Sequence, residues 1–142
     1  YYKEHQVEYM YLTYQLDGIT YNKENELDFK EFYSRMRAGS MPTTSQVNSE
    51  EAKDVLRPLL EAGNDVLHLA FSSGLSGSYN SVRLAAEELK EEYPDRKILV
   101  VDSLCASLGE GLFVYKAVQM KEAGASVDEV AAWLEEHRSS LI

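Results

Sequence analysis

The sequence predicts an α/β domain with an open, mostly parallel sheet in three layers, flanked by helices on both faces. Two observations favour this class. Residues 66–71 (VLHLAF) and 97–102 (KILVVD) are apolar runs too short for helices, as expected of strands covered on both faces. Helical patterns alternate with these runs, which is typical of βαβ units. Because two such strands are few for a parallel sheet, we expect a further strand to belong upstream of residue 1.

The N-terminal part is predicted to form a hairpin followed by a short helix. Residues 7–16 alternate as a strand does, an Asp-Gly pair gives a strong two-residue turn signal, and 19–21 forms the return strand. Asp28 begins a capping-box pattern and Gly39 ends the helix. The apolar residues of this helix share one face and are expected to pack: Phe29, Phe32, Tyr33 and Met36.

Four helices are predicted after this hairpin unit, at 49–62, 78–92, 106–123 and from a Ser126 capping box onward. Pro58 should kink or interrupt the first of them. The helix at 106–123 is apolar over most of its circumference and is expected to be well buried. The stripes expected to pack in the other three are Ala52, Val55, Leu56, Leu59 and Leu60; Val82, Ala85, Ala86 and Leu89; and Val127, Val130, Ala131 and Leu134.

The composition excludes several classes of function. With 14 Lys and Arg against 24 Asp and Glu, the net charge of the 142 residues is −10, which argues against nucleic acid and anionic membrane surfaces as partners. No apolar run approaches the ~20 residues of a transmembrane helix. A single cysteine, Cys105, allows no intrachain disulfide and suits the cytoplasm. No His, Cys and Asp cluster has metal-ligand spacing, so we expect no metal and no cofactor.

Two segments rich in hydroxyl groups are candidates for binding an anion. FSSGLSGSYNS (71–81) follows a predicted strand at the sheet edge where α/β proteins bind ligands. Gly77 lets a ligand approach the backbone, and Ser76 and Ser78 offer hydroxyl donors beside a helix N-terminus. MPTTSQ (41–46), predicted to be a loop, presents three further hydroxyls. Ordinary helix capping on flexible loops is the alternative explanation for both segments.

The remaining motifs do not indicate an enzyme. No G-x-G-x-x-G or P-loop pattern is present, and the Gly74-Leu75-Ser76-Gly77 spacing does not match a serine-hydrolase elbow. His68 lies in the middle of a predicted strand, where a core histidine is more common than a base. No histidine pattern accompanies Cys105.

The combined motifs resemble the DegV family of fatty-acid-binding proteins. The resemblance rests on DFKEFYSRMRAG, MPTTSQVNSEE, FSSGLSGSYNSVRLAAEEL and VVDSLCASLGEGLFVYKA, which occur in the family's order over nearly the whole chain. It implies a longer, two-domain bacterial protein that holds a long-chain fatty acid in a tunnel between its domains. Some members present the acid to a separate fatty-acid kinase subunit that phosphorylates it, which connects them to phospholipid synthesis.

The resemblance also implies a site. The family holds the carboxylate with a Thr of the TTSQ segment and a Ser of the LSG turn, which here are Thr44 and Ser76. Plausible neighbours are Ser45, Gly77 and Ser73. On this basis the protein is a lipid-binding carrier without catalytic residues, and the kinase activity resides in its partner.

The chain departs from the family pattern in four places. It lacks the first buried strand, which in the family ends in Asp-Ser-Thr-Ala-Asp, and the C-terminal domain, so residues 1–142 are expected to be a partial N-terminal domain. Val47 replaces a usual Pro, and 22–25 (NKEN) replaces an Asp-Gly. A second hypothesis is a Rossmann-like sugar-phosphate isomerase or transferase that uses the same serine-rich turns for phosphate. Its weakness is the lack of a base near those turns.

Overall fold

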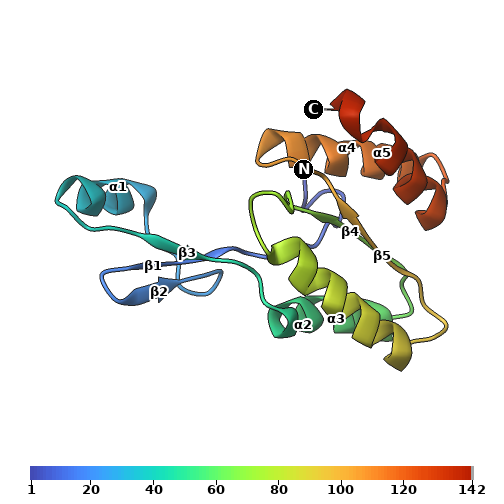
Figure 1. The fold of residues 1–142 in the computed structure, drawn as a ribbon, viewed down its shortest axis with the longest axis horizontal. Coiled ribbons are helices and arrows are strands. Elements are labelled where there is room, and N and C mark those ends of the chain that lie inside the picture. The colour runs from blue at the N-terminus through green and yellow to red at the C-terminus, as the bar shows by residue number, and fades with distance from the viewer. Residues whose placement is uncertain (142) are drawn as a thin grey trace.

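The central feature of the fold is a parallel pair of strands, β4 (Val66–Ala70) and β5 (Ile98–Asp102), in a computed structural model that describes residues 1–141. Both predicted strands are thus confirmed. Helices cover the pair on both faces, which gives the three-layer α/β arrangement (Figure 1). They are α2 (Ser49–Glu61) and α3 (Ser78–Glu92) on one face, and α4 (Leu108–Glu122) and α5 (Val127–Leu141) on the other.

Each helical layer has its own hydrophobic core. On the α2 and α3 side, the predicted stripe of α3 is buried throughout, because its members recur at helical spacing. On the α4 and α5 side, Phe113 and Leu134 are fully buried and pack with Val101 of β5. The two cores hold the strand pair between them, so the loops that follow β4 and β5 begin from strands that are fixed in place.

A smaller lobe, which we call the arm, projects from this body (Figure 1). A three-stranded antiparallel sheet forms it in the order β2-β1-β3, and one short helix lies beside the sheet. Asp17 and Gly18 both have positive φ, which is the geometry of a two-residue hairpin turn and confirms the Asp-Gly signal. The elements are β1 (Thr13–Leu16), β2 (Ile19–Tyr21), α1 (Phe29–Arg37) and β3 (Thr43–Ser45).

One strand prediction and one loop prediction in this region were wrong. Residues 7–12 are not part of a strand, because a strand requires a hydrogen-bonded neighbour and none lies beside them within residues 1–141. The MPTTSQ segment, predicted to be a loop, contributes β3, in which Thr44 pairs with Tyr14. Its three hydroxyl residues are all exposed, as an edge strand allows.

The structure bears on three helix predictions and contradicts the deep burial expected of α4. Helix α1 forms where expected, but its apolar face stays open: Phe29, Tyr33 and Met36 are all exposed and only Phe32 is half-buried. In α4, only Phe113 and Val118 are buried, since one side of the helix packs on β4 and α5 while its apolar outer side faces solvent. Helix α2 continues through Pro58, so the break that was one of the two predicted effects of this proline does not occur.

Candidate functional site in the serine-rich turns

The turns that follow β4 and β5 are bonded to each other at one edge of the sheet. The Asp102 carboxylate, at the end of β5, accepts hydrogen bonds from the backbone N–H of Ser73 (3.1 Å) and of Leu104 (3.0 Å). Burial acts to raise the pKa of Asp102, but hydrogen bonds from Ser73 and Leu104, with the positive charge of Arg138, outweigh it, and the net pKa is lowered. Asp102 is therefore ionised at neutral pH and ties the two turns together.

The buried hydroxyl of Ser103, next to Asp102, reinforces this junction. Ser103 is fully buried, donates its hydroxyl to the carbonyl of Ala70 (2.7 Å) and accepts from the N–H of Cys105 (3.1 Å). The N–H of Ser72 donates to the Cys105 carbonyl (2.9 Å). Such a satisfied polar network rigidifies its surroundings, so the turn carrying Ser76 starts from a well-fixed base.

The LSG turn also contacts the segment that follows β3. The Gly77 N–H donates to the Gln46 side-chain carbonyl (3.0 Å), and a Cβ added at Gly77 would collide with that amide. The Val47 N–H donates to the Ser78 hydroxyl (3.1 Å), and the Ser78 N–H donates to the Ser76 hydroxyl (3.1 Å). The two hydroxyl oxygens lie 2.9 Å apart. A side chain at Gly77 would therefore displace the Gln46 amide from this contact between two segments distant in sequence.

The five predicted site residues occupy two neighbouring places. Thr44 and Ser45 lie on the exposed edge strand β3, directly before Gln46. Ser76 and Gly77 lie in the LSG turn, whose Gly77 N–H is already bonded to Gln46. Ser73 is exposed at the other end of that turn, where its N–H is bonded to Asp102. The Gln46–Gly77 contact therefore joins the two predicted segments.

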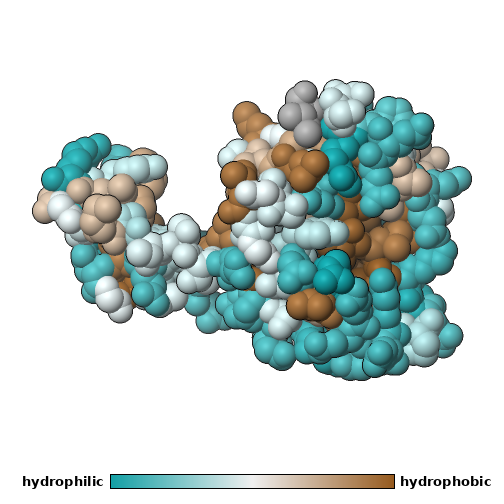
Figure 2. All heavy atoms as spheres, viewed as in Figure 1, coloured by the Kyte–Doolittle hydropathy of each residue, from teal (hydrophilic) through white to brown (hydrophobic). Residues whose placement is uncertain are grey.

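Exposed leucines accompany these polar turns. Leu75 of the LSG turn is 69% exposed, and Leu104 and Leu108, which follow β5, are 45% and 91% exposed. Figure 2 shows hydrophobic atoms on the side of the body that faces the arm, the side on which Figure 1 places the turn between β4 and α3. A polar centre beside exposed apolar side chains suits a ligand with an anionic head and a hydrocarbon chain.

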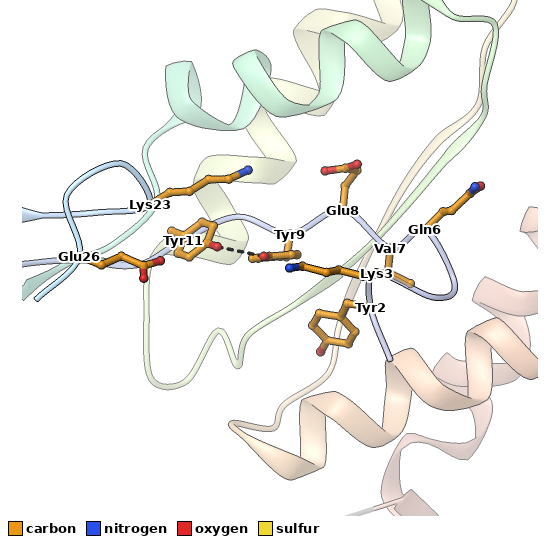
Figure 3. A pocket seen from close by; sticks show the side chains of 9 residues that line it. All are labelled: Tyr2, Lys3, Gln6, Val7, Glu8, Tyr9, Tyr11, Lys23 and Glu26. Atoms are coloured by element: carbon orange, nitrogen blue, oxygen red, sulfur yellow. Dashed lines mark hydrogen bonds between the residues drawn. The ribbon is translucent and has the colours of Figure 1, made fainter. Parts of the chain in front are cut away.

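Two cavities open on the molecule, and Val47 and Ser78 of the hydrogen-bonded network line the second of them. A hollow of about 530 Å³ is bordered by the N-terminal segment and by Lys23, as Figure 3 shows. In it the Tyr11 hydroxyl donates to Tyr9, and this hydrogen bond is the main reason that the pKa of Tyr11 is raised to about 12. Neither this hollow nor the second cavity includes Thr44 or Ser76 in its lining.

The second cavity, of about 1110 Å³, lies between residues 7–10 and the outer edge of β4. Val66 and Ala70 bond to the β5 side, so Leu67 and Leu69 direct their backbone N–H and C=O groups toward this cavity. An alkyl chain could not satisfy those groups. The N–H and C=O groups of a further strand could satisfy them.

The chemistry available at the serine-rich turns is binding through neutral donors. His68 lies on β4 beside the large cavity, and burial lowers its pKa to about 4, so it is uncharged at neutral pH. Within residues 1–141, no cluster of His, Cys, Asp and Glu could hold a metal ion. No helix of that stretch has the length and apolar content needed to span a bilayer.

Two residues of this network, Gln46 and Asp102, were not predicted as site residues, and Ser78 was predicted only as a possible hydroxyl donor to an anion. Gln46, Ser78 and Asp102 all lie in the motifs that the sequence analysis singles out, but their roles depend on pairings across 29 or 31 residues. Spacing along the chain cannot reveal such partners. The available signal was that Ser78 begins a predicted helix and Asp102 ends a predicted buried strand.

Comparison with known proteins bears on the ligand. The family model described as "Uncharacterised protein, DegV family" matches residues 1–142. A DegV domain-containing protein of Clostridium perfringens is 45% identical over 141 residues, which are 98% of this chain and 48% of that protein. The chain thus spans about half the length of the curated relatives it matches.

Solved structures of proteins that bind fatty acids share the fold of this chain. A stearic-acid-binding protein from Eubacterium ventriosum superposes with a TM-score of 0.84 at 31% identity, covering 94% of this chain and 47% of that one. A DegV family protein from Thermus thermophilus, described by its fatty-acid binding, gives a TM-score of 0.78 at 39% identity, covering 90% and 44%. Both relatives are fatty-acid-binding proteins.

Proposed function

The chain belongs to the DegV family, and from this premise we propose that it is part of a carrier that binds a long-chain fatty acid. The observation that carries the proposal is the contact between the LSG turn and the segment after β3, which holds hydroxyl donors beside exposed leucines. Family relatives that bind fatty acids share this fold, which supports the assignment.

We assign Thr44 and Ser76 as the donors to the carboxylate. Side chains alternate along an extended chain, so Thr44 lies on the same face as Gln46, and the Gln46 amide reaches the LSG turn. Ser45 and Thr43 lie on the opposite face, which favours Thr44 over Ser45 as the donor from this strand. Ser73 and Gly77 remain neighbours of the site, with their N–H groups engaged by Asp102 and Gln46.

In the proposed complex the two ends of the ligand have separate roles. Burial of the hydrocarbon chain supplies most of the affinity, at ~0.8 kcal/mol per CH₂. The hydroxyls orient the carboxylate and keep it accessible to a separate fatty-acid kinase, so the carrier itself is not an enzyme. The chain would be the partial N-terminal domain of a two-domain cytoplasmic protein whose other domain covers the hydrocarbon.

The first test is mass spectrometry of the full-length protein purified from cells under native conditions, followed by lipid extraction. A fatty acid bound at about one per chain is the expected result. A protein that is empty, takes up no added fatty acid and binds a sugar phosphate instead would replace this proposal with the isomerase hypothesis.

Substitution of the two donors tests the head-group assignment. Thr44→Val and Ser76→Ala should each weaken stearate binding by about 10-fold to 100-fold, because a hydrogen bond to a charged group contributes ~1.5–3 kcal/mol. Titration calorimetry on the full-length protein measures the change. Thr43→Val is the matched control, since Thr43 precedes Thr44 on β3 and points to the other face. Unchanged affinity in both variants would show that the carboxylate binds elsewhere.

A further inference from the structure

The direction of the hydrogen bond between Ser76 and Ser78 follows from burial. Ser78 is 6% exposed, and within residues 1–141 its hydroxyl bonds only to the Val47 N–H and to the Ser76 hydroxyl. The Val47 N–H is a donor, so the Ser78 oxygen accepts from it. A buried hydroxyl that fails to donate its proton loses free energy. Either oxygen could donate in this contact, and because Ser76 is the one acceptor for the Ser78 proton within residues 1–141, we assign Ser78 as the donor.

This direction fixes the role of Ser76. The Ser76 oxygen accepts from the Ser78 N–H at 3.1 Å and from the Ser78 hydroxyl at 2.9 Å, which uses both of its lone pairs. Its own proton is then its one remaining hydrogen-bonding group. Because Ser76 is only half-buried, that proton can point away from the protein. The hydroxyl becomes a pure donor, which suits a carboxylate.

We infer that Ser78 is a positioning residue: it directs the Ser76 hydroxyl proton toward the ligand carboxylate without touching the ligand itself. The chain of donors runs from the Val47 N–H through the Ser78 hydroxyl to the Ser76 hydroxyl, and each bond polarises the next. The inference rests on the proposed function, because it assumes that Ser76 donates to the fatty acid.

A double-mutant cycle on stearate binding by the full-length protein tests this role. Ser78→Ala should weaken binding by about 3-fold to 10-fold, since Ser76 loses a donor and its proton is no longer directed outward. In a Ser76→Ala background, Ser78→Ala should have almost no further effect on affinity. Ser78→Thr keeps the hydroxyl and should restore most of the binding.

Ser81→Ala is the matched control, because Ser81 lies one turn further along α3, is half-buried, and its hydroxyl forms no hydrogen bond within the described residues. It should leave stearate affinity unchanged. The outcomes separate the proposed function from the positioning role of Ser78. If Ser76→Ala has no effect, the proposed function fails at its head-group site. If Ser76→Ala weakens binding but Ser78→Ala does not, or if the two effects multiply, Ser78 does not act through Ser76.

Discussion

At the scale of single residues, the sequence predicted which segments carry the candidate donors, and the structure shows which of their N–H groups are already bonded. The N–H groups of Ser73 and Gly77 are already engaged by Asp102 and Gln46, whereas the inferred direction of the Ser76–Ser78 hydrogen bond leaves the Ser76 proton available. The difference arises because hydrogen bonding depends on partners about 30 residues away. A motif identifies the residues but not the direction in which their protons point.

His68 gives a prediction about pH at this scale. Burial lowers its native pKa to about 4, while the unfolded chain keeps a value near 6.5. Below pH ~6.5 the unfolded state therefore binds a proton that the native state does not, and the free energy of unfolding falls by up to ~1.4 kcal/mol per pH unit as the pH drops toward 4.

Urea unfolding of the wild type and of His68→Leu at several pH values between 7 and 5 checks this expectation. The wild type should lose stability over that range, and the variant should lose less, since it has no imidazole to protonate. The comparison stops at pH 5, because carboxylates titrate below it. Parallel pH profiles for the two proteins would mean that His68 is accessible to protons in the folded state.

At the scale of secondary-structure elements, sequence signals predicted helices better than strands, because a helix forms through interactions between residues close together in the chain. Helix α3 spans the predicted residues 78–92, because its apolar spacing buries one complete face, and the predicted capping box at Ser126 forms with both of its hydrogen bonds. Strands are different, since they depend on distant partners. Residues 7–12 have strand-like alternation but no neighbour, while β3 forms from a polar segment because β1 offers it an edge.

The open edge of β4 yields a prediction about hydrogen exchange. The amides of His68 and Ala70 face β5 and should be protected, whereas those of Leu67 and Leu69 face the large cavity and should exchange much faster. NMR exchange on the 142-residue chain measures all four. In a longer form of the protein that supplies a further strand, Leu67 and Leu69 should become as well protected as their neighbours. Equal protection of all four amides in the 142-residue chain would mean that another segment already covers this edge.

At the scale of the whole molecule, the chain consists of a body with two cores and an arm whose helix buries none of its residues. The exposed apolar side chains include Phe29 and Tyr33 on the arm and Leu75 and Leu108 beside the serine-rich turns. Known relatives with this fold are about twice as long. We therefore expect the head-group donors to reside in this chain, and most of the surface that covers the hydrocarbon to be contributed by the rest of the full-length protein.

That division predicts how affinity depends on the length of the fatty acid. In the full-length protein each additional buried CH₂ should strengthen binding by close to fourfold, which corresponds to ~0.8 kcal/mol. In the 142-residue chain the gain per CH₂ should be much smaller, because the hydrocarbon would meet only exposed leucines on one side. Calorimetric titration of both forms with decanoate, myristate and stearate measures the gain in binding free energy per CH₂ in each form. The Thr44→Val substitution should lower affinity by a similar factor for all three acids, since it affects only the contact with the carboxylate. Equal gains per CH₂ in the two forms would place the hydrocarbon site within residues 1–142, and the exposed leucines would then have to close around the ligand without a second domain.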